Sequence, residues 1–172
     1  LLVQDHRVAP YCPRCGTGLS DHELAMGYET VVDPSVYVRL PLTSGPLAGV
    51  SALLVWTTTP WTLVSNTATA VHPGVSYVAA TDGAETLVVA EPLLASALGA
   101  DWTVTSRFTG AEMEGWQYAA PFGLVDIPEA HYVVVDEYVT TEDGTGLVHQ
   151  APAFGADDLR VGRRYGLPVV NP

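Results

Sequence analysis

The 172-residue chain has few charged side chains, and very few of them are basic. It contains 7 Lys and Arg against 19 Asp and Glu, for a formal net charge of −12, and only 15% of its residues are charged. A nucleic-acid-binding face needs clustered Lys and Arg, so any contact with nucleic acid must be local. Neither GxGxxG nor GxxxxGK[ST] occurs, which excludes the usual glycine-rich phosphate loops.

Long apolar runs are also missing. No run approaches the ~20 residues that a membrane span requires, and the N-terminus lacks a basic stretch followed by an apolar one. We therefore expect a cytoplasmic, monomeric fragment without membrane contact. The chain opens without Met, and residues 165–172 look like a continuing segment, which suggests a piece of a larger protein.

Cysteine is scarce, and both residues lie in one motif, Cys12-Pro13-Arg14-Cys15 followed by Gly16. This spacing is half of a zinc knuckle, and tetrahedral zinc needs four ligands. Within the segment only His6 and His22 could complete the set. We favour a half site whose other ligands lie outside the fragment, over a complete local site or idle reduced thiols. Residues 1–27 are thus predicted to be a stalk or linker, and residues 28–172 the main domain.

Turn residues and β-branched runs are plentiful, with 16 Gly and 13 Pro in the chain. The pattern predicts two helices, at residues 92–98 and 157–165, and strands at 28–42 (broken at 33–34), 50–56, 66–71, 75–81, 84–90, 102–109, 116–120, 131–138 and 147–150. Asp82-Gly83 indicates a hairpin with a primed turn. Many short strands favour a mainly β fold, a closed or nearly closed barrel with short peripheral helices, or alternatively a sandwich.

Two polar segments each follow a short apolar strand. The first is Trp56-Thr57-Thr58-Thr59-Pro60-Trp61-Thr62, and Pro60 must end the strand because it cannot donate to a ladder. The second is residues 144–158, in which a short apolar strand again ends in polar groups and a proline. A hydroxyl-rich turn is the commoner role of an isolated Thr run; a second such segment favours a site. For Arg160, Arg163 and Arg164 we favour a solvated helix face over nucleic-acid contact.

These residues resemble a known family. The matching motifs are Val55-Trp56-Thr57-Thr58-Thr59-Pro60-Trp61-Thr62-Leu63, Asn66, Ala70-Val71-His72-Pro73, Gly144-Thr145-Gly146-Leu147-Val148-His149 and Gly155-Ala156-Asp157-Asp158. They are similar to the editing domain of isoleucyl-tRNA synthetase, called connective peptide 1 (CP1), over residues 28–172, and Cys12 and Cys15 match the flanking zinc stalk. Thr59 and His149 distinguish the isoleucyl type from its valyl and leucyl relatives. Phe154 departs from the common bacterial pattern, which has His there.

The resemblance implies hydrolysis of the ester in valyl-tRNA mischarged on isoleucine-specific tRNA, by an oriented water; hydrolysis of valyl adenylate stays open. It implies that Asp158 binds the substrate ammonium, which an ionised carboxylate near a helix N-terminus suits. By its place at the start of the predicted helix, Asp157 is the better candidate for the helix cap. Thr57, Thr58 and Thr59 would stabilise the oxyanion. For His149 the resemblance favours a pocket wall, and a general base is the alternative.

For two further residues the sequence leaves two alternative roles open. Trp61 is a wall or a core aromatic, and Asn66 is a hydrogen-bond partner in the site or a turn cap. Gly144, Thr145 and Gly146 would let the terminal adenosine approach the backbone closely. No cofactor is expected for editing; zinc and ATP would belong to the parent enzyme, and the partners would be the tRNA 3′ end and the rest of the synthetase.

Three alternative functions remain open. One is a non-catalytic barrel that holds the aminoacylated tRNA end, and another is the equivalent domain of a valyl or leucyl synthetase. The third is a zinc-ribbon interaction module in which residues 1–24 carry the function. Turnover of a mischarged ester separates the first from an editing enzyme.

Overall fold

Short strands dominate the computed structural model, which describes residues 2, 4–5, 7–30 and 32–172. The strands are β1 (Tyr11–Cys12), β2 (Thr17–Gly18), β3 (Val36–Pro41), β4 (Ala52–Thr57), β5 (Ala68–Val71), β6 (Ser76–Thr81), β7 (Thr86–Ala90), β8 (Thr103–Thr109), β9 (Tyr132–Val135) and β10 (Leu147–Gln150). The α-helices are α1 (Asp21–Ala25), α2 (Leu94–Leu98), α3 (Gly110–Met113) and α4 (Ala156–Tyr165), with 3₁₀ helices η1 (Pro60–Ser65) and η2 (Glu91–Leu93). The prediction of a mainly β fold with short helices is confirmed.

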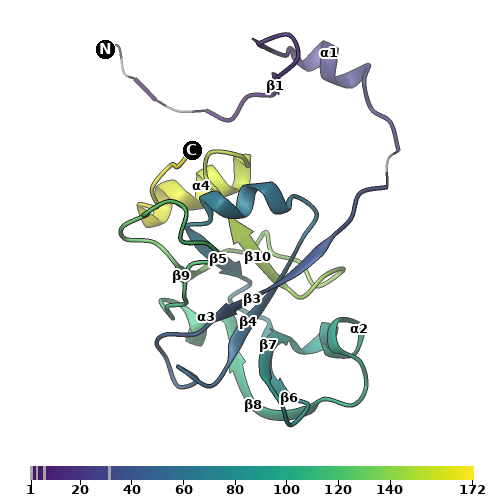
Figure 1. Cartoon of the computed structure of the whole chain (residues 1–172), viewed down its shortest axis with the longest axis vertical. Helices are drawn as coiled ribbons and strands as arrows, with labels where there is room; N and C mark the ends of the chain where they lie inside the picture. The colour runs from purple at the N-terminus through teal and green to yellow at the C-terminus, as the bar shows by residue number, and fades with distance from the viewer. Residues whose placement is uncertain (1, 3, 6, 31) are drawn as a thin grey trace.

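The main strands form two open sheets (Figure 1). One has five strands in the order β3-β4-β7-β6-β8, and the other three strands in the order β10-β5-β9. The pairs β4–β7 and β5–β9 are parallel, and the other neighbours are antiparallel. A closed barrel was therefore the wrong expectation for the described residues.

The divergence of β4 from β7 explains why the strands do not close into a barrel. Only Ala52 and Leu53 of β4 pair with β7, so the last residues of β4 leave that neighbour and lie beside β10. Antiparallel pairing of β4 with β3, by contrast, continues from Ala52 to Thr57. The end of β4 is thus held between the two sheets, where its polar continuation meets β10.

A shared apolar core joins the two sheets. It is made of buried side chains from both, among them Leu53, Val55, Tyr77, Val133 and Leu147. On its other face the five-stranded sheet packs against α2 through the cluster around Leu54 and Val89. The helix α4 packs on the three-stranded sheet through Val161, against Ala68, Ala70 and Val134. Burial of these faces fixes where α4, and with it Asp158, stands relative to β10.

The β6–β7 hairpin and the end of α4 can be compared directly with their sequence predictions. The hairpin of β6 and β7 is present, but Thr81 pairs with Thr86, so the loop has four residues rather than a primed two-residue turn. Asp82 Oδ1 accepts from the N–H groups of Ala84 and Glu85 and closes this loop. Gly166 ends α4 in the left-handed conformation, with φ of 70°, as a C-terminal glycine should.

Two strand predictions were wrong in extent. Residues 116–120 form no strand and make only isolated bridges at Gln117 and Tyr118. The strand predicted over 28–42 is ordered as a strand only from Val36, and Val31 lies outside the described residues.

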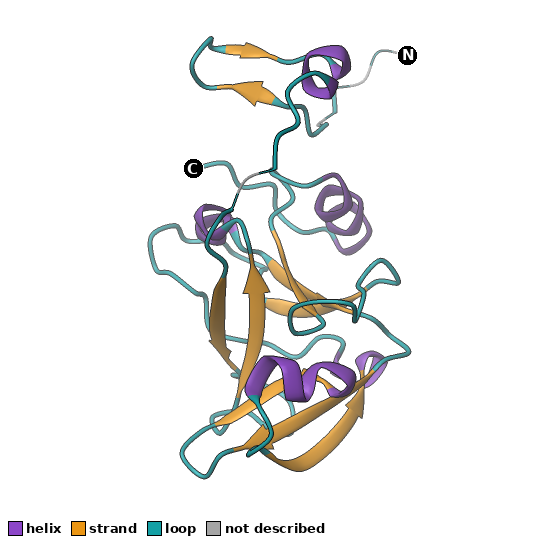
Figure 2. Ribbon diagram, turned by 90° about the vertical axis from the view of Figure 1, so that its right-hand side faces the viewer, coloured by secondary structure: helices purple, strands orange, loops and turns teal. Residues whose placement is uncertain are grey.

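The N-terminal residues form a small β1–β2 hairpin and α1, which stand apart from the two sheets (Figures 1 and 2). Ser20 caps α1 reciprocally with Glu23 in a capping box. Across the described part of the chain, no helix has both the length and the apolar character to cross a membrane.

Candidate active site at the ends of β4 and β10

The hydroxyl run lies where β4 gives way to η1. Pro60 begins the 3₁₀ helix, a position in which proline loses no hydrogen bond. Thr57 is buried, whereas Thr58 and Thr59 are exposed. The Thr57 hydroxyl oxygen accepts from the N–H of Thr59 at 3.1 Å and lies 3.3 Å from the Thr59 hydroxyl. The turn thus presents two neighbouring hydroxyls at one strand end.

A pocket of about 370 Å³ opens between this turn, β10 and the start of α4. It is lined by Trp56, Thr57, Thr59, Trp61, Thr62, Val148, His149, Phe154, Gly155 and Asp158. The two polar segments, nearly ninety positions apart in sequence, therefore meet in one cavity. Its volume is at the small end of the ~300–1,000 Å³ range of ligand sites, so it suits a small ligand group.

Several of the predicted site residues line this pocket. Thr57, Thr59, Trp61, His149 and Asp158 line the pocket. Trp61 is 67% exposed, so its alternative role as a core aromatic was wrong. Thr58 lies outside the lining.

Asn66 and the glycine-rich segment lie beyond the pocket wall. Asn66 is buried and hydrogen-bonds to His149 from behind the pocket. Thr145 and Gly146 line a neighbouring cavity of about 210 Å³, which shares Trp56 and Val148 with the first. Gly144 packs on Trp56, because a Cβ on it would meet the indole ring at 2.7 Å.

Asp158 projects into the pocket from the first turn of α4. Its Oδ2 accepts from the N–H of Ala151 at 3.2 Å. Burial raises the pKa of Asp158 to about 6, the Ala151 N–H lowers it, and the charge of Asp157 raises it. Burial therefore outweighs the helix N-terminus, which we expected to stabilise the charged form. At pH 7 the carboxylate is still mainly ionised.

Gly155 makes room for this carboxylate. A Cβ added at Gly155 would lie 2.7 Å from Asp158 Oδ2, closer than such atoms approach without displacement. Gly155 is also the N-cap residue of α4, and no side chain caps the helix. The expectation that Asp157 caps α4 was wrong: its carboxylate is exposed and pairs with Arg160 at 3.2 Å. The helix therefore begins without a competing side chain beside Asp158.

The His149 imidazole is buried, and hydrogen bonds engage both ring nitrogens. Nε2 lies 2.8 Å from the Thr62 hydroxyl, and Nδ1 lies 3.3 Å from Asn66 Nδ2. Since Thr62 donates its proton to the Thr59 carbonyl at 2.8 Å, its oxygen must accept from Nε2–H. Burial lowers the pKa of His149 to about 4, so the ring is neutral at pH 7, with Nδ1 already accepting from Asn66 and no free lone pair for a water.

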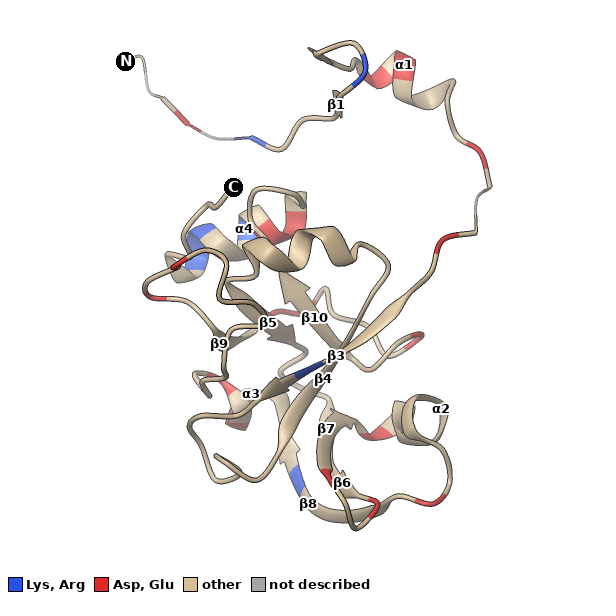
Figure 3. Ribbon diagram, in the orientation of Figure 1, with Lys and Arg blue, Asp and Glu red and all other residues tan. Residues whose placement is uncertain are grey.

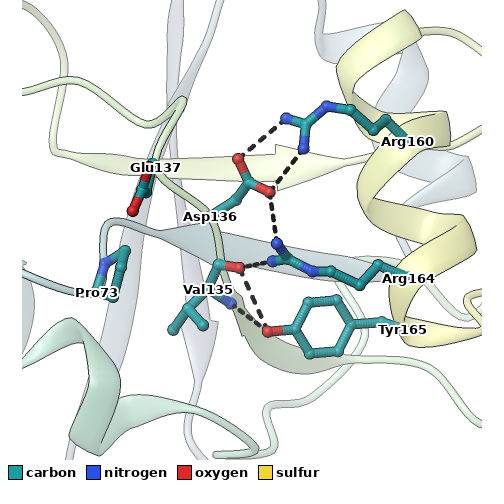
Figure 4. A pocket seen from close by; sticks show the side chains of 7 residues that line it. All are labelled: Pro73, Val135, Asp136, Glu137, Arg160, Arg164 and Tyr165. Atoms are coloured by element: carbon teal, nitrogen blue, oxygen red, sulfur yellow. Dashed lines mark hydrogen bonds and ion pairs between the residues drawn. The ribbon is translucent and has the colours of Figure 1, made fainter.

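Helix α4 is tied to the three-stranded sheet by an ion-pair cluster (Figure 4). Asp136, 5% exposed, accepts from the two terminal guanidinium nitrogens of Arg160, at 2.9 and 3.0 Å, and from Arg164 at 3.1 Å. The two arginines hold the pKa of Asp136 below its usual range, Arg160 most strongly. The Tyr165 hydroxyl accepts from the N–H of Val135 at 3.1 Å. The cluster anchors the helix that carries Asp158.

The basic side chains of α4 are engaged within the chain. Figure 3 shows them gathered on this helix, with acidic residues spread over many elements. Besides the two arginines on Asp136, Arg163 pairs with Asp5 at 2.7 Å. The helix face is solvent-accessible and charge-balanced, consistent with the solvated face that the sequence favoured.

The cysteine motif supplies two thiols near each other. The Cys15 N–H donates to Cys12 Sγ at 3.4 Å, and this hydrogen bond lowers the Cys12 pKa. Among the described residues no three His, Cys, Asp or Glu side chains cluster as metal ligands, so Cys12, Cys15 and His22 do not form a site together. His6, the other predicted ligand, lies outside the described residues. The thiols suit zinc, but they are half of a ligand set.

Comparison with curated proteins gives close relatives over the whole chain. The isoleucine-tRNA ligase of Streptomyces coelicolor is 79% identical over 174 residues, which cover 100% of this chain and 17% of that protein. Those of Thermobifida fusca and Thermus thermophilus are 75% and 51% identical, over 100% and 99% of this chain and 16% of each relative. The chain belongs to the isoleucine-tRNA ligase family. It spans about a sixth of the length of these relatives, and no protein-family model matches it.

Solved structures identify the fold of this ligase segment. The crystal structure of GlLeuRS-CP1 matches with a TM-score of 0.62 at 20% identity, covering 77% of this chain and 63% of that one. The editing domain of the P. knowlesi cytosolic leucyl-tRNA synthetase matches with a TM-score of 0.58 at 15% identity, covering 80% and 65%. The ligase segment therefore has the fold of a CP1 editing domain.

Sequence reasoning missed several residues around the pocket of this segment. Trp56, Thr62 and Val148 stood inside the two motifs, directly beside predicted site residues, and that adjacency was the signal that could have found them. Gly155 was visible as a glycine three residues before Asp158, but its close approach to the carboxylate arises only in the folded chain. Tyr118, which donates to Asn66 at 2.7 Å, carried no local signal.

Proposed function

We propose that this isoleucine-tRNA ligase segment hydrolyses the ester of valyl-tRNA that has been mischarged on isoleucine-specific tRNA. The observation that carries the proposal is the convergence of the Asp158 carboxylate and the Thr57 and Thr59 hydroxyls on one pocket. An aminoacyl ester has an ammonium group next to a carbonyl, and these two groups need an anion and hydrogen-bond donors close together.

Asp158 binds the α-ammonium of the aminoacyl group. The carboxylate is half-buried, has no cationic side chain among its described hydrogen-bond partners, and keeps one bond from the Ala151 N–H. A partly desolvated anion of this kind gains from a cationic ligand, because pairing offsets the cost of burial. Ligand binding should therefore lower the pKa of Asp158.

The turn after β4 orients the ester carbonyl and the attacking water. The Thr57 hydroxyl oxygen is held in place by the Thr59 N–H, and the exposed Thr59 hydroxyl lies 3.3 Å from it, so the two hydroxyls present a pair of hydrogen-bonding groups to the ester. The substrate ester is activated already, and an oriented water suffices without a protein nucleophile. His149 is neutral with both nitrogens engaged, and it therefore serves as a wall that limits side-chain size.

The neighbouring cavity receives the terminal adenosine. Thr145 and Gly146 line it, and it shares Trp56 and Val148 with the first cavity, so these two side chains lie on the border between the two. A ligand that crosses Trp56 and Val148 would place its amino acid in one cavity and its nucleoside in the other. The same arrangement would accept valyl adenylate.

The rest of the ligase completes the activity. With net charge −12, the segment holds only the tRNA 3′ end, and the remaining enzyme supplies tRNA affinity and ATP-dependent activation. Cys12 and Cys15 give two zinc ligands, and further residues of the ligase give the others. The editing reaction itself uses no cofactor, and the ligase works in the cytoplasm.

Deacylation assays test the proposed activity directly. Valyl and isoleucyl esters of isoleucine-specific tRNA are incubated at high protein concentration with the wild-type chain, Asp158→Asn and Asp157→Asn. The last is a matched control, because its exposed carboxylate is on the same helix and outside the pocket lining. We expect preferential cleavage of the valyl ester, lost in Asp158→Asn and kept in Asp157→Asn.

The same assay is repeated with this chain grafted into the Streptomyces coelicolor ligase in place of the corresponding segment. Binding of both esters without cleavage, in the chain and in the graft, would contradict hydrolysis and favour a non-catalytic binding module.

A further inference from the structure

A hydrogen-bond chain leads from the apolar core to the pocket wall. It begins at Tyr118, which is 3% exposed and belongs to the core cluster shared by the two sheets. The Tyr118 hydroxyl donates to Asn66 Oδ1 at 2.7 Å. Asn66 lies next to His149 Nδ1, and His149 reaches the Thr62 hydroxyl. Tyr118 itself lies outside the pocket lining.

The two ends of this chain determine the direction of every hydrogen bond in it. At one end Asn66 Nδ2 donates to the Ala68 carbonyl at 3.0 Å, so Oδ1 faces Tyr118 and the second amide hydrogen faces Nδ1. At the other end Thr62 donates to the Thr59 carbonyl, so its oxygen accepts from Nε2. Carbonyl groups can only accept, and both ends therefore require the same tautomer, with the proton on Nε2.

We propose that Tyr118 is a positioning residue of the pocket, which acts through Asn66 to hold His149 in one tautomer and one ring orientation. The consequence for selectivity rests on the function proposed above. The tyrosine backbone is held as well, because its N–H donates to the His131 carbonyl at 2.9 Å. Its ring packs edge-on against His131, at 5.9 Å between centroids. These contacts hold the tyrosine in place, so its hydroxyl keeps its position next to Asn66.

Removing the hydroxyl leaves Asn66 Oδ1 buried and unpaired. An unpaired buried acceptor is costly, so the amide should rotate or shift towards another donor. Asn66 Nδ2 then no longer fixes Nδ1 as an acceptor, and His149 can exchange between tautomers. Without this hydrogen bond the ring can also turn. A turned ring changes the shape of the wall and releases the Thr62 hydroxyl, which donates to the Thr59 carbonyl.

The first readout is the tautomer of His149, which does not depend on activity. Long-range ¹H–¹⁵N spectra of the ¹⁵N-histidine-labelled chain distinguish the protonated ring nitrogen, and the His149→Gln variant identifies the signal among the 5 histidines. In the wild-type chain we expect a single neutral Nε2–H form at pH 7. An Nδ1–H form there would overturn the proposal without any variant of Tyr118.

The second readout compares Tyr118→Phe with Tyr132→Phe. Tyr132 is a matched control, since its hydroxyl donates at 3.3 Å to the carbonyl of Tyr165, at the other end of α4 from Asp158. In Tyr118→Phe we expect mixed tautomers and about a tenfold fall in the ratio of valyl to isoleucyl ester cleavage, the size set by one unpaired buried acceptor. Tyr132→Phe should keep both values.

Each result then has one meaning. A Tyr118→Phe chain with a single Nε2–H tautomer and unchanged selectivity would refute the positioning role. If neither wild-type chain nor graft cleaves any ester, the proposed function fails, and the tautomer spectra alone decide on Tyr118.

Discussion

Asp158 should reduce the stability of the empty domain at neutral pH. Burial raises its pKa from 3.8 to about 6. The folded chain therefore holds the proton more tightly than the unfolded chain, and stability falls as the pH rises between these two values. The difference of about two pH units corresponds to roughly 3 kcal/mol at pH 7.5, as an upper figure.

The substitution Asp158→Asn removes this cost while keeping shape and the bond from the Ala151 N–H. The amide has its own desolvation cost, so we expect a net gain of about 1–2 kcal/mol at pH 7.5. For a domain of this size the gain corresponds to a rise in Tm of roughly 3–6 °C. At pH 4 the wild-type carboxyl is mostly protonated in the folded state, and the gain should almost disappear.

The assay is thermal or urea unfolding of wild type, Asp158→Asn and Asp157→Asn at pH 4.0, 5.5 and 7.5. The Asp157 variant loses an exposed ion pair with Arg160, which is worth about 0–1 kcal/mol, so it should not be stabilised. Equal stability of wild type and Asp158→Asn at pH 7.5, or a gain that persists unchanged at pH 4, would refute the burial argument. A gain together with lost deacylation would show a functional group kept at the expense of stability.

Two further predictions concern Gly155 and the cysteines. Gly155→Ala should displace the Asp158 carboxylate, because the new Cβ would lie 2.7 Å from Oδ2. We expect valyl ester cleavage to be at least about tenfold slower. The control Gly123→Ala, where a Cβ meets nothing within 4 Å, should keep the wild-type rate. For zinc, the chain alone should bind less than one equivalent in a chromogenic chelator competition, because Cys12 and Cys15 are two of four ligands, whereas Cys12→Ala in the grafted ligase should reduce its metal content. Stoichiometric, tight zinc in the isolated chain would contradict the half site.

The amino-acid sequence by itself determined the local elements. Short apolar runs on either side of Asp82-Gly83 placed the strands of the β6–β7 hairpin. Acids at one end, arginines at the other and Gly166 beyond them placed α4. These signals act within one turn or one strand, so they can be read without a fold. The two polar segments were also visible, because Pro60 and the residues before α4 must interrupt regular structure.

Only the tertiary structure decided how the sheets and the pocket are arranged. The parallel β4–β7 and β5–β9 pairs join strands far apart in the chain, and no local pattern distinguishes them from a closed barrel. The pKa of Asp158, the room left by Gly155 and the bond from Tyr118 to Asn66 depend on which groups exclude water from one another. Burial is a property of the packed whole, and therefore the chemistry of this site could not be read from its residues alone.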